Sequence, residues 1–125
     1  MAYEQKESLE QQALFQWAEL QSIRFPELKL LHHIPNGGKR DISTAVRLKK
    51  EGVKAGVPDI SLPAPRGKYH GLYIELKVDK NKPTEEQERW LKELNRQGYV
   101  AMACWGWEEA KEVILEYLKL GRRGL

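Results

Sequence analysis

The sequence predicts an α/β protein in which a mixed β-sheet is flanked by helices, with the elements in the order αβαββαβα. Apolar residues recur at helical spacing in several segments, and β-compatible residues fill segments between them. The loop between the two central strands is too short for a crossover helix, so these strands should pair as an antiparallel hairpin. The strand, helix and strand that follow should form a right-handed parallel crossover.

In the first half of the chain we expect a helix over residues 4–23, a strand over 28–34, a turn over 35–38 and a helix over 43–51. Apolar residues of the first helix, such as Leu9, Leu14 and Trp17, recur at near-helical spacing. Pro26 ends this helix because the residue before a proline avoids helical backbone angles. Gly52 is the expected C-terminal cap of the second helix.

In the second half we expect strands over residues 57–62, 71–78 and 99–105 and helices over 84–97 and 107–118. The segment 71–78 has the strongest strand pattern in the chain, because most of its residues are β-compatible. Thr84 and Gln87 have the spacing of a capping box, which marks the start of a helix. Gly98 marks the end of that helix.

The composition indicates one compact domain over residues 1–125, large enough to bury a core without disulfides. A net charge of +3 and a pI of about 9.0 permit a polyanionic partner without requiring one. Cys104 is the single cysteine, which excludes an internal disulfide and fits a reducing compartment. The polar N-terminal segment does not resemble a signal peptide, and no apolar run approaches the ~20 residues of a membrane span. We therefore expect a soluble cytoplasmic protein that makes no membrane contact.

The chemistry is expected to centre on Glu75 and Lys77 in the strand 71–78. Side chains two residues apart point to the same face of a strand, so these two charged groups emerge together. Charged groups that face inward beneath a helix are costly without partners, and a metal ion with an anionic substrate would supply them. The preceding strand opens with Pro58 and Asp59, and the hairpin allows Asp59 to face Glu75.

An acid followed two residues later by a lysine is common by chance. The same pattern occurs at Glu4 and Lys6, at Glu27 and Lys29, and at Glu109 and Lys111. Only the pair at Glu75 lies inside a strong strand that follows a second strand with its own acid. This context separates it from the chance occurrences.

Two carboxylates and a backbone carbonyl form a hard oxygen site, which suits Mg²⁺ or Mn²⁺. Asp59, Glu75 and the carbonyl of Leu76 are the expected metal ligands. A divalent cation makes its bound water more acidic, so the water can attack a phosphodiester. Lys77 would position or deprotonate the attacking water, or neutralise developing charge.

Two further residues are candidates for the same site. Glu10, from the first helix, is a possible third acid that completes or orients the metal shell; the alternative is a solvated helix acid like its neighbours. Gln87 is expected to hydrogen-bond the water, the phosphate or Lys77. Its alternative role is only that of a helix cap.

These residues resemble the PD-(D/E)XK nuclease superfamily, and more closely the stand-alone VRR-NUC domains of phages and prophages. The resemblance extends over nearly the whole chain, in residues 10–18, 34–38, 52–59 and 73–77 and in Thr84 with Gln87. It implies a restriction-endonuclease-like fold, divalent-metal-dependent phosphodiester cleavage, and a homodimer active on branched DNA, in particular four-way (Holliday) junctions. It also implies a phage- or prophage-encoded protein in a bacterial host. The matching active-site positions are Glu10, Asp59, Glu75 and Lys77, with Gln87 as the accompanying glutamine.

Basic residues cluster before Asp59 and are expected to bind DNA phosphates without reading the base sequence. The glycine turn in this region lets the backbone approach a phosphate closely. The expected DNA-binding residues are Asn36, Gly37, Gly38, Lys39, Arg40, Arg47, Lys50 and Lys54, together with Arg66 and Lys68 in the hairpin loop. The alternative is a lysine-rich solvated helix. The tryptophans, Trp90 among them, are expected in the core or at an interface, and a histidine metal site at His32 and His33 is not expected.

Other functions remain compatible with the sequence. A sequence-specific nuclease of the same fold would need groove-reading loops, and the loops here are short. A less selective DNA nuclease or nickase, a ribonuclease, and a catalytically silent DNA-binding module are the further alternatives. The complete set of Asp59, Glu75 and Lys77 favours an enzyme over a silent module.

Overall fold

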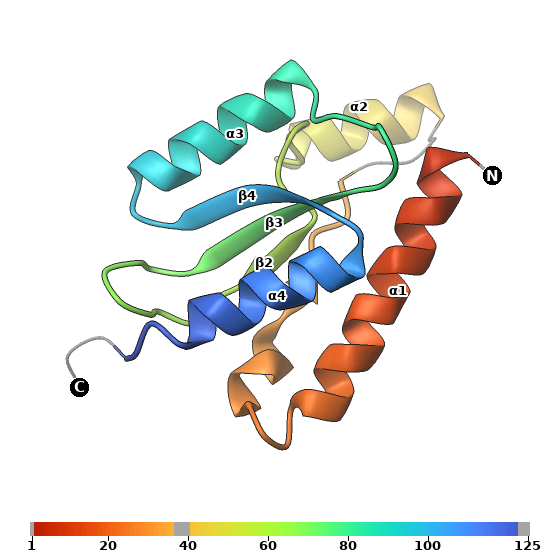
Figure 1. Ribbon diagram of the computed structural model, residues 1–125. Coiled ribbons are helices and arrows are strands. Elements are labelled where there is room, and N and C mark those ends of the chain that lie inside the picture. Colours follow the sequence, from red (N-terminus) through yellow and green to blue (C-terminus); the bar gives the residue numbers. More distant parts are fainter. Residues whose placement is uncertain (1, 37–40, 123–125) are drawn as a thin grey trace.

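The computed structural model describes residues 2–36 and 41–122 (Figure 1). The elements in chain order are α1 (Tyr3–Gln21), the 3₁₀ helix η1 (Pro26–Leu30), β1 (His32–His33), α2 (Ile42–Lys50), β2 (Ile60–Leu62), β3 (Leu72–Lys77), α3 (Glu85–Arg96), β4 (Val100–Trp105) and α4 (Trp107–Leu118). The predicted α/β class is confirmed, and the α-helix ends lie within about two residues of the predicted ones, as expected for frayed ends. No helix in the described part of the chain has the length and apolarity to cross a membrane.

The sheet has four strands in the order β1-β2-β3-β4. β2 pairs antiparallel with β3, with Ile60 opposite Ile74. β3 pairs parallel with β4, with Leu76 opposite Cys104. The predicted hairpin and the predicted parallel crossover are both confirmed.

Successive side chains of β3 point to opposite faces of the sheet. On one face Ile74 joins a buried cluster with Leu14 of α1 and Ile114 of α4, so these two helices cover the apolar core. On the other face Glu75 receives a hydrogen bond from Gln87 of α3. The strand therefore separates the core from a polar site, because its side chains alternate.

The predicted strand over 28–34 is only partly correct. The segment begins as η1, and only His32–His33 pair with β2. Pro26 stands at the start of η1, where its fixed φ favours a helical turn. Leu28 and Leu31, three residues apart, are both buried, a spacing that puts both on one side of a 3₁₀ helix but on opposite faces of a strand.

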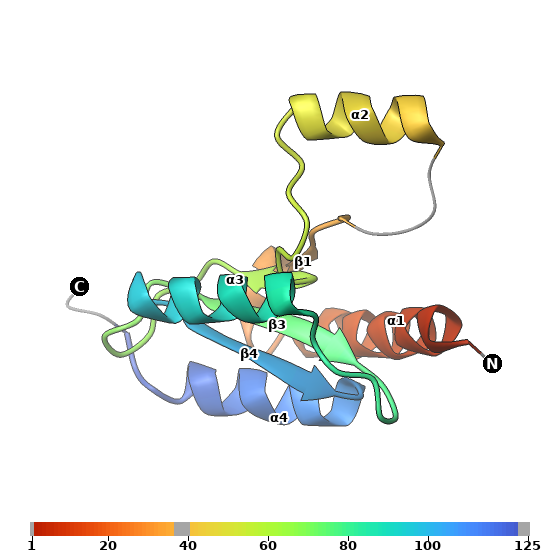
Figure 2. The same cartoon turned by 90° about the horizontal axis from the view of Figure 1, so that it is seen from above.

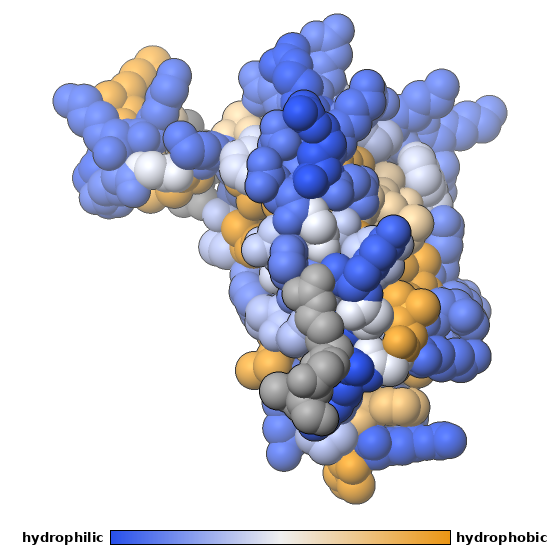
Figure 3. Space-filling model, turned by 90° about the vertical axis from the view of Figure 1, so that its left-hand side faces the viewer, coloured by the Kyte–Doolittle hydropathy of each residue, from blue (hydrophilic) through white to orange (hydrophobic). Residues whose placement is uncertain are grey.

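The helix α2 projects from the body of the molecule. Figure 2 shows it standing apart from the layers formed by the sheet and the other helices, and Figure 3 shows the projecting segment carrying both hydrophobic and hydrophilic residues. None of the residues 42–50 is buried. Ile42 and Val46 are 84% and 48% exposed. An apolar edge of α2 is therefore left uncovered by the other residues that the structure describes.

Candidate active site

Two acidic side chains meet where β2 begins and β3 ends. The register of Ile60 with Ile74, continued by one residue, puts Asp59 opposite Glu75. Oδ2 of Asp59 accepts a hydrogen bond of 2.9 Å from the backbone N–H of Leu76, which turns this carboxylate toward β3. The hairpin therefore brings the two carboxylates together as an acid pair.

Glu75 and Lys77 are buried although both carry ionisable groups. Their exposed fractions are 2% and 5%, so each needs a partner inside the protein. Oε2 of Glu75 accepts a hydrogen bond of 3.1 Å from Nε2 of Gln87 and lies 3.6 Å from Nζ of Lys77. Oε1 of Glu75 is also buried, and no donor within the described residues reaches it.

Burial and the neighbouring acid raise the pKa of Glu75 from 4.5 to about 8. Removal from water contributes most, followed by the negative charge of Asp59 and a hydrogen bond between the two carboxyl groups. The charge of Lys77 lowers this pKa, and the charge of Glu7 raises it further. In the absence of a cation, the acid pair therefore holds a proton at neutral pH.

The acid pair fits a divalent cation. A proton shared by the two carboxyl groups neutralises part of their charge, whereas a cation would satisfy Oε1 of Glu75 with both carboxylates ionised. The N–H and C=O of a strand residue point to the same edge, so the carbonyl of Leu76 also lies on the side of Asp59. These oxygens are donors that Mg²⁺ and Mn²⁺ prefer. Within residues 2–36 and 41–122 no group of three or more His, Cys, Asp or Glu side chains could hold a metal, so water or substrate would have to complete the shell.

Two acids of α1, Glu4 and Glu7, line a pocket beside this site, and the sequence prediction missed both. This acidic pocket has a volume of about 300 Å³ and is also lined by Asp59 and Leu76. Of the two acids, Glu7 is the one whose charge raises the pKa of Glu75. Its Oε2 accepts a hydrogen bond of 2.7 Å from Nδ2 of Asn81, in the loop after β3. His33 lines the same pocket, and its Nδ1 lies 2.8 Å from the carbonyl oxygen of Asp59. These contacts hold Glu7 and His33 beside the acid pair.

The structure places Glu10 elsewhere. Its Oε1 accepts a hydrogen bond of 3.0 Å from the N–H of Trp107, the first residue of α4. A carboxylate at a helix N-terminus satisfies a free N–H and complements the helix dipole. In this structure the side chain joins α1 to α4, and the role of Glu10 as a metal ligand stays a prediction.

Three of the predicted DNA-binding residues near α2, Arg47, Lys50 and Lys54, are exposed. Gly37, Gly38, Lys39 and Arg40 lie outside the described residues. Asn36 lines the acidic pocket. Arg47 and Lys50 are exposed on α2, where Arg47 pairs with Glu51 at 3.2 Å, and Lys54 follows the helix.

The two basic residues of the hairpin loop are placed far from the acid pair. The hairpin joins the end of β2 to the start of β3 (Figure 1). Asp59 instead precedes β2, and Glu75 lies near the end of β3. Arg66 is buried and ion-paired with Glu27. Arg66 is therefore already paired inside the protein, and Lys68 lies at the end of the strands away from the acid pair. DNA binding by these two residues stays a prediction.

Comparisons with known proteins match the chain to one family. A family model described as "VRR-NUC domain" matches residues 1–107. A solved structure described as "VRR_NUC domain protein" has a TM-score of 0.80 and 34% sequence identity, over 93% of this chain and 90% of that chain. Among curated proteins, none matches the chain.

Proposed function

The chain belongs to the VRR-NUC domain family of DNA-processing nucleases, and from this premise we propose that it is a divalent-metal-dependent endodeoxyribonuclease selective for branched DNA. The observation that carries the proposal is the buried acid pair of Asp59 and Glu75, in which Oε1 of Glu75 lacks a donor. Hydrolysis would form a bond from a water oxygen to phosphorus and break one P–O ester bond. The leaving alkoxide would take up a proton.

Asp59, Glu75 and the carbonyl of Leu76 are the residues that would hold Mg²⁺ or Mn²⁺. A cation of this kind would polarise the phosphodiester and make water a stronger nucleophile. Glu7 lies at the pocket wall, where its carboxylate would bind the same cation through water. Gln87 fixes Oε2 of Glu75 and so leaves Oε1 for the cation.

Lys77 supplies a positive charge at the same place. Its ammonium group is buried and lies 3.6 Å from Oε2 of Glu75, so its position is fixed before the substrate binds. A fixed charge in a water-poor site stabilises negative charge that develops on the phosphate more strongly than the same charge in water. Lys77 would also orient the attacking water through its N–H donors.

The proposed substrate is branched DNA, in particular the four-way (Holliday) junction, and the proposed active form is a homodimer. A symmetric junction has to be cut on two strands, and two active sites related by a twofold axis would do this. In such a dimer, the exposed apolar edge of α2 with Ile42 and Val46 would pack against the partner copy. Arg47 and Lys50 on α2, and Lys54 after it, would supply salt-dependent phosphate contacts.

The test is a panel of duplex, flap, splayed and four-way DNA and of matching RNA, each with EDTA, Mg²⁺ and Mn²⁺. We expect cleavage of branched DNA only when a cation is present. Equal cleavage of all DNA forms would indicate a less selective nuclease, and cleavage of RNA alone a ribonuclease. Binding without cleavage under every condition would indicate a catalytically silent DNA-binding module.

Variants of the acid pair and the lysine complete this test. Asp59→Asn and Lys77→Ala should abolish cleavage while leaving the fold and most DNA binding intact. Lys119→Ala, which removes an exposed lysine after α4, is the matched control and should cleave normally. Normal turnover by either site variant would contradict the assignment.

A further inference from the structure

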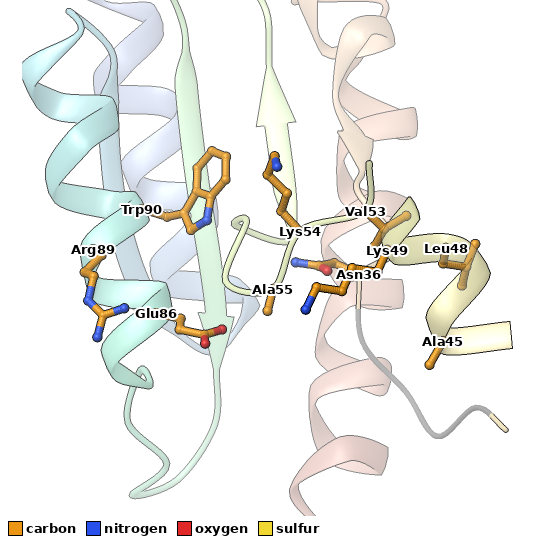
Figure 4. Close-up of a pocket in the computed structure, with 10 residues that line it drawn as sticks. All are labelled: Asn36, Ala45, Leu48, Lys49, Val53, Lys54, Ala55, Glu86, Arg89 and Trp90. Atoms are coloured by element: carbon orange, nitrogen blue, oxygen red, sulfur yellow. The ribbon is translucent and has the colours of Figure 1, made fainter. Parts of the chain in front are cut away.

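A second cleft lies between α2 and α3. It has a volume of about 790 Å³, within the range of sites that hold small ligands. Its walls come from Asn36, from α2, from the residues 53–55 that follow it, and from the first turns of α3 (Figure 4). The proposed function assigns no role to this cleft as a whole.

The side chains of the cleft combine positive charge with an aromatic wall. Lys49, Lys54 and Arg89 carry positive charges, and Glu86 carries the opposing negative charge. Figure 4 shows the indole of Trp90 reaching from α3 into the space that faces Lys54, so this tryptophan lies at a surface cleft and not in the core. Sites for single-stranded nucleic acid use this combination, because phosphates meet the cations while bases stack on the ring.

The inner wall of the cleft is closely packed. Gly56 has a φ of +91°, and a Cβ on it would come within 2.8 Å of the carbonyl carbon of Glu86 and 2.9 Å of Cδ1 of Trp90. Only glycine therefore fits where this loop crosses α3. The contact sets the backbone next to Lys54 at a fixed place relative to the indole before any ligand binds.

Asn36 connects this cleft to the active site, because it lines both the cleft and the acidic pocket. Its Nδ2 donates a hydrogen bond of 3.3 Å to the carbonyl of Val57. Its Oδ1 is buried and accepts no hydrogen bond from the described residues. A buried acceptor without a donor is costly. Of the parts of a DNA strand, a nucleobase carries N–H donors that would satisfy this atom, whereas a phosphodiester has none.

We infer that the cleft binds one unpaired nucleotide of the DNA substrate, next to the phosphodiester that is cut. The base stacks on Trp90 and donates to Oδ1 of Asn36, while the phosphate contacts Lys54 and Lys49. The inference rests on the proposed nuclease function and narrows its substrate. A paired base inside a duplex offers no free face for stacking, so the enzyme should prefer branch points at which a nucleotide is unpaired. A four-way junction would have to open a base pair at its branch point to use this cleft.

The inference is tested with a DNA flap that carries the fluorescent base 2-aminopurine at the unpaired position next to the branch. Binding is measured in EDTA, so that the readout does not depend on cleavage. The wild-type protein should quench the probe as its base stacks on the indole. Trp90→Ala should abolish this quenching and weaken binding about tenfold, the loss expected for one base stacked on an aromatic ring. Trp90→Phe should keep most of the affinity.

Charge variants test the phosphate contact independently of the ring. Lys54→Ala should lower the salt dependence of binding by about 0.7 in the slope of log K against log salt concentration, as for one lost contact to a single strand. Glu86→Gln should strengthen binding because it removes the acid of the cleft. Lys92→Ala, an exposed lysine on the same helix that does not line the cleft, is the control and should change neither value.

The outcomes separate this inference from the proposed function. If the wild-type protein cleaves the flap with Mg²⁺ but Trp90→Phe, Trp90→Ala and Lys54→Ala all bind and quench as it does, the nucleotide site is wrong and the nuclease stands. If the wild-type protein quenches the probe but cleaves nothing with either cation, the site stands and the nuclease is wrong. If circular dichroism shows that Trp90→Ala does not fold, the result with Lys54→Ala decides whether the inference holds.

Discussion

Nε2 of Gln87 donates a hydrogen bond of 3.1 Å to Oε2 of Glu75, and this contact joins the first turn of α3 to the strand that carries the acid pair. Oε1 of the same amide accepts a hydrogen bond of 2.9 Å from the N–H of Thr84, and Oγ1 of Thr84 completes the capping box. The two roles considered for Gln87, helix cap and site residue, are therefore compatible. One side chain caps the helix and orients an acid.

Replacing Gln87 with glutamate should separate these two roles. Gln87→Glu keeps an acceptor for the N–H of Thr84, because glutamate also serves in a capping box. It also replaces the N–H donor to Glu75 with a carboxylate, which adds a negative charge beside Asp59 and Glu75. We expect near-normal thermal stability and a large loss of cleavage at limiting Mg²⁺, measured on the best branched substrate.

Thr84→Ala is the matched control for this change. It removes the cap but leaves the contact of Gln87 with Glu75 possible, so it should cost about 1 kcal/mol of stability and little activity. A Gln87→Glu protein that cleaves as well as the wild type would show that Gln87 does not act on Glu75.

The stability of the metal-free protein should depend on pH through Glu75. Its pKa is about 8 in the folded chain against 4.5 ordinarily, so between these values the folded state binds a proton that the unfolded state does not. The stability from this group is fully present below pH 4.5 and is lost as pH rises through about 8. The decline is on the order of a few kcal/mol.

Glu75→Gln should remove this part of the pH dependence, which denaturant titrations in EDTA at several pH values would measure. Relative to the wild type, the variant should gain stability as pH rises. Binding of Mn²⁺ to the wild type near pH 7 should release a proton, detectable by calorimetry in buffers with different heats of ionisation. An identical pH profile for the two proteins would contradict the raised pKa.

Glu7 and Glu10 should have opposite effects when truncated. Glu7→Ala should raise the metal concentration needed for cleavage, because Glu7 lines the pocket of the acid pair, with a small effect on stability. Glu10→Ala should lower stability by about 1 kcal/mol, because the N–H of Trp107 loses its acceptor, and should leave the metal requirement unchanged. The reverse pattern would restore Glu10 as the acid of the site.

Charge reversal on α2 should weaken DNA binding, whereas reversal on the hairpin should not. Lys50→Glu with Arg47→Glu should weaken binding to all DNA structures and lower the salt slope by about 0.9 for each lost duplex contact. Lys68→Glu is the control, because the hairpin lies at the far end of the sheet from the acid pair. Equal losses from both changes would place the DNA across the whole sheet rather than beside α2.

Much of the fold could be predicted from the sequence, because local patterns decided most elements. The short loop between β2 and β3 required the hairpin, and Thr84 with Gln87 marked the start of α3. The segment before β1 was harder, since Leu28 and Leu31 fit an apolar strand as well as a 3₁₀ helix. Packing against the core, which the sequence does not state, decided between them.

The candidate site was predictable where the acids lie on paired strands and not where one lies on a helix. A strand leaves only two faces for Glu75, whereas the rotation of α1 decides which of its many acids meets the sheet. The helical spacing of the sequence could have pointed to Glu7. Leu14 and Ala18, which are buried, lie seven and eleven residues after Glu7 and therefore on the same side of the helix. The environment of Arg66 could not be foreseen, since its partner Glu27 is distant in sequence.

The most direct test of the central claim is anomalous diffraction from crystals soaked in Mn²⁺. The account predicts one strong anomalous peak within coordination distance of the carboxylates of Asp59 and Glu75 and the carbonyl oxygen of Leu76. The peak should vanish in Asp59→Asn crystals. A wild-type crystal at saturating Mn²⁺ with no peak at these oxygens, or with its peak on other residues, would contradict the claim.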